Sequence, residues 1–579
     1  MLCLKRDLLR RKAAIILIGV FVGLSYRILI SRGNFLNTQF YLPTYTGQHK
    51  TLSKRDAMTA KLQFITDWTE FINSRTNFTR IHNGCNMTWK KQNAIPWMKK
   101  LERTCSDKSF ISIWNINPVG EFSRVVLQTQ FTNGTIKLYG GDYWRVYVRG
   151  SSSVPVLKTD LGNGSYEFKF FPLLSGSYKL DISLEYTLCD GIKEPPDDWF
   201  RKGNVQGKEQ KHGILFHDMP YINKTLWSGT EINFYVPSNR LLAKETSFLM
   251  DEMCAADEVS SCKYLWNGFG GWLNKTTWQP LCFVSLCVLM VMKMMDTRCR
   301  MILCLLNILQ INMPLFTIFR GKVLFCFKGA AIPRYPRHKE GILWIFGDSV
   351  SSQFYHSIKR NRICKQIFKN CMYSYNWIYS LENYNLTLKR YVRRNSTVEK
   401  KLWNDLDFDA GKVIKELQQA VLNPSMDSKS AILLNYGLHF TEATNFTNFK
   451  KLIKEVVNLK DQIKCKIIWR TTTSLNRHKY SMPNLHSRRF MTSQFYIYTV
   501  NPQGTSTLIQ RRIDRVQLYN AYATNEFCKA GIDVLDIYPL TDSYPFGTGS
   551  ARSRTDPVHY EYHVMRPMEV QLERVFQPL

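Results

Sequence analysis

The chain has 579 residues, which at about 150 residues per domain predicts two to four domains and excludes a single small module. Hydrophobic residues make up 44%, aromatic residues 13% and charged residues 21%, a composition that excludes wholesale disorder, collagen and an extended coiled coil. The 78 Lys and Arg outnumber the 46 Asp and Glu, and the net charge of +32 attracts polyanions such as nucleic acid, anionic lipid or acidic glycan. The compartment decides among these partners.

The N-terminal 30 residues combine a basic segment with an apolar one. Residues 1–12 are rich in Lys and Arg and precede an apolar segment at 13–30. Because basic flanks stay in the cytosol, this order predicts a type II signal anchor with a cytosolic tail at 1–12, an anchor at 13–30 and a lumenal C-terminus. A cleaved signal peptide, which would give a secreted protein, is the alternative. Under both interpretations nucleic acid is not expected as a partner, and the anchor interpretation makes the membrane one.

Sequons and cysteines fit a lumenal chain. The 15 cysteines include two close pairs, Cys254 with Cys262 and Cys364 with Cys371, but connectivity does not follow from sequence. No Cys or His spacing demands a metal, so no metal site is predicted. Basic clusters at 334–339 and 389–394 are expected either to face acidic glycans or to be solvated surface. Predicted N-glycosylation sites are spread along the chain, at Asn77, Asn86, Asn133, Asn163, Asn223, Asn274, Asn385, Asn395 and Asn445.

Residues 31–107 are a mixed polar segment that we expect to form a stem, with a helical stretch at 57–72. In the range 108–250, short alternating runs at 135–139, 144–148, 166–171 and 178–186 are separated by Gly- and Asn-rich turn signals. This spacing predicts an antiparallel, immunoglobulin-like β-sandwich.

The range 251–324 is interpreted as a linker that contains an apolar insert at 281–319. A single membrane span there would leave the later sequons in the cytosol, so a buried segment or, second, a membrane hairpin is expected. From 325 to 579, strand-like runs at 342–346, 431–435, 466–470 and 533–537 alternate with amphipathic stretches at 449–463 and 508–530. This alternation predicts an α/β domain with a mostly parallel sheet, whose ligands bind at the carboxyl ends of the strands.

The apolar run at 342–346 leads directly into Gly347-Asp348-Ser349. Glycine permits a tight turn, and the helix that follows would direct its free N–H groups and the positive end of its dipole at an anion developing beside Ser349. Ser349 is therefore a candidate nucleophile. An ordinary turn is the alternative for this tripeptide taken alone.

A serine nucleophile needs a base and a group that orients the base. Asp556 and His559 are three residues apart, a spacing at which the carboxylate can fix the tautomer of an imidazole that faces the serine. The motif Asn435-x-Gly437-x-His439 follows the apolar run at 431–434. The Asn435 amide, with backbone N–H groups at Ser349 or Gly437, is predicted to form an oxyanion hole. Singly, each residue has a simpler interpretation as a cap, a surface histidine or a strand end.

Together these blocks resemble the SGNH/GDSL-type PC-esterase domain. The stretches KLYGGDY at 137–143 and DLGNGSY at 160–166 resemble the filamin-like, neurexophilin-like immunoglobulin module, and the whole arrangement resembles the NXPE family. The resemblance covers about residues 108–579. It implies Ser349 as acyl acceptor, His559 as general base and then acid, and Asp556 as the orienting group. Related PC-esterase proteins are Golgi membrane proteins that move acetyl groups on glycan hydroxyls, which implies the same location here.

The sequence therefore favours a secretory-pathway glycan O-acyltransferase or acylesterase that works through an acyl-serine intermediate. No bound cofactor is expected; the acyl donor is acetyl-CoA or another carrier, and the acceptor is a glycan or glycoprotein. The alternative is a catalytically inert binding or adhesion ectodomain that recognises a protein or glycan, with the immunoglobulin-like module as the contact for a protein partner. A cytosolic nucleic-acid binder is a third hypothesis, which predicts unused sequons and reduced cysteines.

Overall fold

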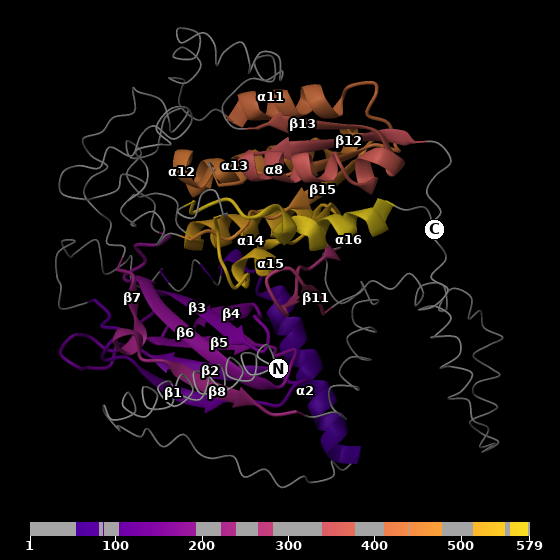
Figure 1. Cartoon of the computed structure of the whole chain (residues 1–579). Coiled ribbons are helices and arrows are strands. Elements are labelled where there is room, and N and C mark those ends of the chain that lie inside the picture. Colours follow the sequence, from indigo (N-terminus) through magenta and orange to yellow (C-terminus); the bar gives the residue numbers. More distant parts are fainter. Residues whose placement is uncertain are drawn as a thin grey trace, which may run out of the picture. The chain divides into compact units, whose positions relative to one another are not determined.

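A computed structural model describes residues 54–79, 81, 85, 103–192, 222–238, 264–281, 339–376, 410–438, 440–476, 513–549 and 556–576 (Figure 1). The chain divides into two compact units, Met1–Asp56 and Ala57–Leu579, and nearly all of the described structure belongs to the second. The predicted anchor at 13–30, the apolar insert beyond residue 281 and His439 lie outside the described residues. Within the part that is described, no helix has both the length and the apolar character needed to cross a membrane.

The first half of the second unit is a β-sandwich of two antiparallel sheets, ordered β1-β2-β5-β4 and β3-β6-β7, with β8 also paired to β6. Side chains from both sheets, such as Phe168 from one and Ile182 from the other, form a common buried core. The strands are β1 (Phe110–Asn115), β2 (Ser123–Gln128), β3 (Tyr143–Gly150), β4 (Val156–Asp160), β5 (Ser165–Phe170), β6 (Gly176–Tyr186), β7 (Lys224–Thr225) and β8 (Ile232–Val236).

The strands expected at 144–148, 166–171 and 178–186 form as β3, β5 and β6. The prediction of a strand at 135–139 is wrong. That segment makes only an isolated bridge between Gln130 and Ile136. Its alternation is inverted relative to a core strand, because Ile136 and Leu138 are exposed while Lys137 points inward. The Lys137 ammonium is fully buried and pairs with Asp142, so a charge pair and not an apolar face anchors this segment.

Helix α2 (Lys54–Asn73), in the range expected to be a stem, packs onto the sandwich. Its Phe64, Trp68 and Phe71 join a buried aromatic cluster with Phe122 and Phe171. Just beyond the helix, the Arg75 guanidinium lies 2.7 Å from a carboxylate oxygen of the α/β domain, in Asp536. A disulfide between Cys85 and Cys189 ties the following residues to the end of the sandwich.

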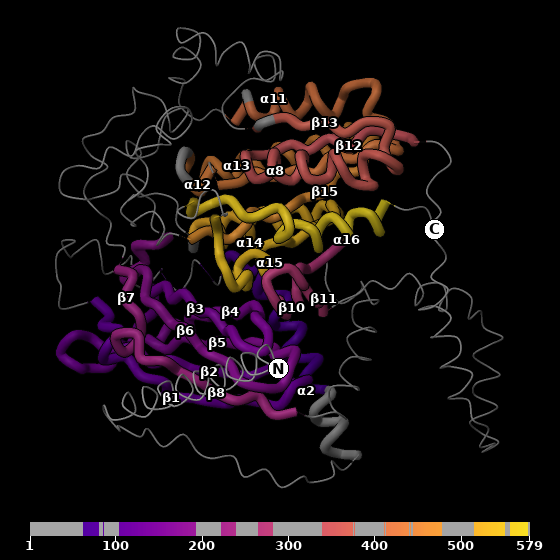
Figure 2. The backbone as a smooth tube through the Cα atoms, viewed as in Figure 1, coloured from indigo at the N-terminus to yellow at the C-terminus, as the bar shows by residue number. Residues whose placement is uncertain are grey.

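The α/β domain is built on a six-stranded sheet in the order β13-β12-β14-β15-β16-β9, and every neighbouring pair is parallel. Helices cover both faces of this sheet, as its buried, apolar strands require. Figure 2 follows the backbone through these layers. The elements are β9 (Tyr264–Trp266), β12 (Glu340–Gly347), α8 (Ser349–Ile358), β13 (Phe368–Tyr375), α11 (Ala410–Val421), β14 (Ala431–Leu434), α13 (Phe446–Asn458), β15 (Lys466–Arg470), α14 (Ile513–Lys529), β16 (Asp533–Leu535) and α16 (Arg566–Phe576).

Alternate residues of β12 show which helices cover which face. Trp344 and Phe346 share a core with α11, α13 and α14. Leu343 and Ile345 share the opposite core with α8 and α16. Strand β12 comes first in this part of the chain and is flanked by β13 and β14, so the strand order reverses at its carboxyl end, the place where open α/β sheets bind their ligands.

Part of the range expected to be a linker is an integral part of the fold. Strand β9 lies between residues 251 and 324 and forms the edge of the parallel sheet beside β16. The hairpin of β10 (Gly270–Trp272) and β11 (Trp278–Pro280) follows it. Trp272 forms a bridge with Ser153 of the sandwich, and its indole N–H donates to the Leu540 carbonyl. The hairpin therefore connects the sandwich to the α/β domain.

Candidate active site

The turn from β12 into α8 places Ser349 at the first position of the helix. Asp348 is the N-cap, and its Oδ1 accepts hydrogen bonds from the N–H groups of Val350, at 3.0 Å, and Ser351, at 3.2 Å. The first N–H groups of a helix lack intrahelical acceptors, and this cap occupies the second and third of them. The N–H of Ser349 is thus the first-turn donor that the cap leaves for another acceptor.

Ser349, His559 and Asp556 lie in a continuous hydrogen-bonded row. Ser349 Oγ is 2.9 Å from His559 Nε2, and His559 Nδ1 is 2.8 Å from Asp556 Oδ2. When Nδ1 carries the proton that faces Asp556, Nε2 is the acceptor for the serine hydroxyl. The row is partly accessible to solvent, since the His559 and Asp556 side chains are 24% and 15% exposed.

Asp556 is held as a carboxylate. Burial alone would raise its pKa, but the hydrogen bond from the His559 imidazole, together with the backbone N–H groups of Val558 and His559, outweighs burial and leaves the pKa below its usual value. An ionised Asp556 orients the imidazole and stabilises it when it becomes protonated.

The segment that carries His559 is fixed by its neighbours. The Gly549 N–H donates to the His559 carbonyl at 2.7 Å, and the Gln353 side chain of α8 donates to the Tyr560 carbonyl at 3.1 Å. The Asn476 N–H donates to the Pro557 carbonyl at 2.9 Å. Contacts from the helix that begins with Ser349 and from two loops therefore set where the imidazole lies. None of the three supporting residues stands out in the sequence.

The side chain of Asn435 has a different role from the one predicted. Its amide donates to the Arg470 carbonyl at 2.9 Å and to Thr472 Oγ1 at 3.1 Å. Because the amide hydrogens are engaged in this way, the expected donation to an oxyanion is corrected to a tie between the ends of β14 and β15. The Asn435 N–H continues the sheet by donating to the Phe346 carbonyl.

Gly437 lies against the nucleophile turn. A Cβ at this position would be 2.2 Å from Asp348 Oδ2 and 2.5 Å from Asn435 Oδ1, so only glycine fits without displacing them. The next residue, Leu438, donates its N–H to Asp348 Oδ2 at 3.3 Å. The Asp348 carboxylate therefore joins the two backbone segments that contain Ser349 and Gly437. Gly347 is similarly crowded, because a Cβ there would be 2.1 Å from Ser351 Oγ.

Arg470 is a site residue that the sequence analysis missed. It is the last residue of β15, is 1% exposed, and its Nη2 donates to Ser351 Oγ at 2.6 Å. The same nitrogen lies 3.9 Å from Asp348 Oδ1. Burial lowers the pKa of Arg470, and the nearby Asp348 carboxylate acts in the opposite direction. The sequence signal for Arg470 is its position as a charged residue at the end of the otherwise apolar run at 467–470.

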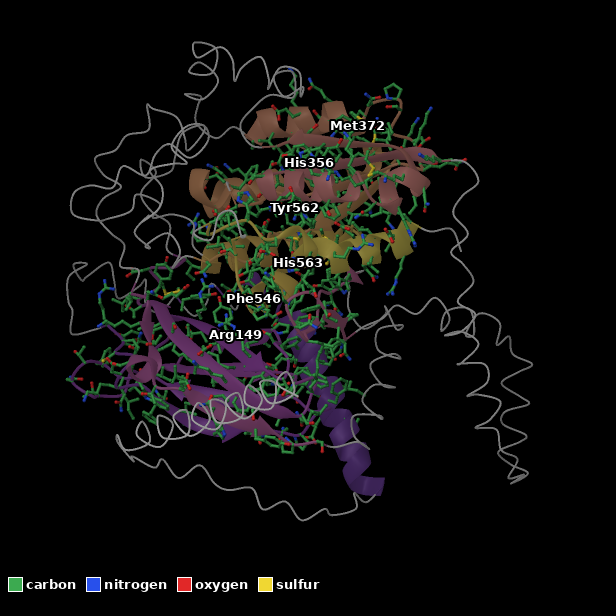
Figure 3. The ribbon with its side chains drawn as sticks, viewed as in Figure 1. Arg149, His356, Met372, Phe546, Tyr562 and His563 are labelled. Atoms are coloured by element: carbon green, nitrogen blue, oxygen red, sulfur yellow. A yellow bond between two sulfur atoms is a disulfide. The ribbon has the colours of Figure 1, made fainter. Side chains whose placement is uncertain are left out.

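Exposed aromatic side chains border the His559 segment. Phe546 is 61% and Tyr562 56% exposed, and Figure 3 shows both near His563. The Lys275 ammonium lies 5.7 Å from the centre of the Phe546 ring. Phe546 belongs to the same loop as Gly549, which is bonded to His559. We refer to the side chains of Phe546, Tyr562 and Lys275 as the rim.

The sequons in the described part of the chain differ in exposure. Asn133, Asn163 and Asn274 are exposed, whereas Asn445 is the N-cap of α13 and accepts the Asn448 N–H. Asn77 is also exposed, Asn223 is partly buried, and Asn86, Asn385 and Asn395 lie outside the described residues. Glycosylation at each stays a prediction. Among the residues with described positions, no group of three or more His, Cys, Asp or Glu is arranged to hold a metal ion.

No family model matches the chain, and no curated protein matches it. Among solved structures, the chain is similar to the lipase/acylhydrolase from Enterococcus faecalis at 12% identity, over 41% of this chain and 95% of that one, with a TM-score of 0.26. It is also similar to the Lin-41 filamin domain at 21% identity, over 14% of this chain and 80% of that one, with a TM-score of 0.13. At these TM-scores neither similarity supports an argument about function, and the NXPE resemblance stays a prediction.

Proposed function

We propose that this chain is a serine-dependent enzyme that transfers an acyl group to a hydroxyl or to water, through a covalent intermediate on Ser349. The observation that carries the proposal is the hydrogen-bonded row from Ser349 Oγ through His559 to Asp556 at the carboxyl end of β12. Its three members come from segments about 210 residues apart in the chain, as the separation of Ser349 from His559 records. Such a row gives a serine both a base and an orienting carboxylate.

The proposed reaction has two steps. His559 Nε2 accepts the hydroxyl proton as Ser349 Oγ attacks the carbonyl carbon of the acyl donor, and the protonated imidazole then passes this proton to the leaving group. The second step runs in reverse. An acceptor hydroxyl or water gives its proton to His559 and attacks the acyl-Ser349 carbonyl, which releases the new ester or the free acid and restores the serine.

The oxyanion formed in both steps needs donors already in position. We assign this role to the backbone N–H of Ser349, which the Asp348 cap leaves available, and to that of Gly437 on the adjacent segment. Each such donor contributes about 10²- to 10³-fold in kcat in enzymes of this kind. Backbone donors keep their geometry without a side chain that must be ordered.

The remaining assignments are proposals of finer detail. The resemblance to PC-esterases supports an acetyl donor such as acetyl-CoA, a glycan hydroxyl as acceptor and a Golgi or other secretory-pathway location. The disulfides Cys85–Cys189 and Cys364–Cys371 support an oxidising compartment, as do the sequons. The sandwich is proposed to contact a protein or glycan partner, and the segment at 13–30 to hold the chain at the membrane.

The test uses purified, glycosylated chain with a fluorophosphonate probe and p-nitrophenyl acetate. We expect probe labelling and ester hydrolysis, both abolished in Ser349→Ala and both retained in the matched control Ser352→Ala on the same helix. Addition of a glycan acceptor followed by mass spectrometry then separates transfer from hydrolysis. A wild-type chain that is folded but neither labelled nor active would overturn the proposal in favour of an inert binding ectodomain.

A further inference from the structure

We infer that Arg470 is a positioning residue for the acyl-transfer reaction, acting through a buried charge pair with Asp348 that holds the two oxyanion donors in register. The inference rests on the proposed function for its effect on rate. The charge pair itself can be tested without any substrate.

Arg470 makes few hydrogen bonds for a buried arginine. Its Nη2 makes one hydrogen bond, to Ser351 Oγ, while its buried Nε and Nη1 have no partner among the described residues. Burying unsatisfied donors of a guanidinium costs free energy. What it supplies is a positive charge 3.9 Å from Asp348 Oδ1, in a site where both side chains are almost fully buried.

The Asp348 carboxylate, beside which that charge lies, accepts three backbone N–H groups. Its Oδ1 takes those of Val350 and Ser351, at the start of α8, and its Oδ2 takes that of Leu438. An ionised carboxylate accepts on both oxygens, whereas a protonated one carries a hydrogen on one of them and loses an acceptor position. Protonation would therefore release either the α8 turn or the segment at 437–438.

This link sets the distance between the proposed oxyanion donors. The N–H of Ser349 belongs to the α8 side of the carboxylate and that of Gly437 to the other side. The titratable groups around the turn are Arg470 from β15, His559 behind the serine, and Tyr373 from β13, whose hydroxyl donates to the Asp348 carbonyl at 3.0 Å. Of these, Arg470 is the one that carries a permanent charge.

The first experiment measures unfolding free energy at about pH 7 for wild type, Arg470→Met, Asp348→Asn and the double variant. Arg470→Met leaves a buried carboxylate without its countercharge, whereas the double variant removes both charges. The loss of stability in the double variant should therefore be smaller than the sum of the two single losses. Asp348→Asn keeps a capping side chain at the start of α8, so the comparison isolates the charge.

Arg515 provides a matched control. It is equally buried, on α14, where its guanidinium donates to the Thr444 carbonyl and the Tyr519 hydroxyl. These hydrogen bonds do not involve Asp348, so the losses of Arg515→Met and Asp348→Asn should add. If the losses of Arg470→Met and Asp348→Asn also simply add, the charge-pair inference is overturned, whether or not the chain is an enzyme.

The second experiment measures kcat and KM for p-nitrophenyl acetate. Arg470→Met should lose about 10²-fold or more in kcat with KM little changed, because the oxyanion donors separate while the rim is intact. Arg470→Lys restores the positive charge, and its kcat should be at least about tenfold higher than that of Arg470→Met. If Arg470→Met does not fold, the kcat of Arg470→Lys can still be compared with that of wild type. Full activity of Arg470→Met would refute the positioning role. A wild type without esterase activity would instead refute the proposed function, and the stability measurements would still decide the charge pair.

Discussion

Replacing Asp556 by asparagine tests the mechanism most directly. The carboxylate faces His559 Nδ1 at 2.8 Å, and the imidazolium formed during the reaction places opposite charges about 4 Å apart. At an effective dielectric constant of about 20, this interaction is about 4 kcal/mol, which corresponds to about three orders of magnitude in rate. Because both side chains are partly exposed, solvent screening lowers the expected loss in kcat to about 10²- to 10³-fold. The asparagine amide would also favour the imidazole tautomer with Nε2 protonated, which cannot accept the serine proton.

The assay is p-nitrophenyl acetate hydrolysis, with thermal unfolding as the check on folding. Asp160→Asn is the matched control, because Asp160 also accepts two backbone N–H groups, from Gly141 and Gly162, but lies in the sandwich. We expect the control to keep wild-type kcat. If Asp556→Asn retains more than a tenth of wild-type kcat, the carboxylate neither orients the imidazole nor stabilises the imidazolium during the reaction.

Three further predictions follow from the same structure. Gly437→Ala should lower kcat about 10²-fold or more with KM little changed, because the added methyl displaces the Asp348 carboxylate. A change in KM alone, measured by steady-state kinetics, would contradict this prediction. Phe546→Ala should raise KM for an aromatic ester several-fold at constant kcat, since the exposed ring belongs to the loop whose Gly549 N–H donates to the His559 carbonyl. An unchanged KM would remove the rim from substrate binding. Burial raises the pKa of Asp160 to about 6, so its contribution to stability is present below about pH 4 and is lost as pH rises through 6. Wild type should therefore lose up to about 3 kcal/mol of unfolding free energy between pH 4 and pH 7.5 relative to Asp160→Asn, and parallel pH curves by chemical denaturation would contradict the buried carboxyl.

The sequence predicted the central strands of the parallel sheet better than its edges. Strands β14 and β15 are buried on both faces, so they appear in the sequence as continuous apolar runs, AILL and KIIWR. Strand β13, FKNCMYSY, is an edge strand with mixed polarity, and β9 has only three residues. Neither carries a periodic signal long enough to separate it from a loop, and both were missed. Their positions depend on pairing with β12 and β16, which is tertiary information.

The site was predictable where chemistry leaves a local pattern. Ser349 follows a strand and starts a helix, and the spacing of three residues between Asp556 and His559 lets the carboxylate face the imidazole Nδ1. Arg470 and Asn435 could not be assigned in this way. Their roles depend on the parallel pairing of β12 with β14 and of β14 with β15, which brings residues about 120 positions apart into contact, as in the bond from Arg470 to Ser351.

The disulfide between Cys85 and Cys189 closes a loop of 104 residues that contains most of the sandwich. A protease that cuts this loop leaves the upstream polypeptide covalently attached to the remainder. Release of a soluble form that keeps both the sandwich and the α/β domain from the anchor predicted at 13–30 would therefore require cleavage upstream of Cys85. Cleavage upstream of α2 would also keep Arg75 beside Asp536, so the liberated protein would retain this contact with the α/β domain.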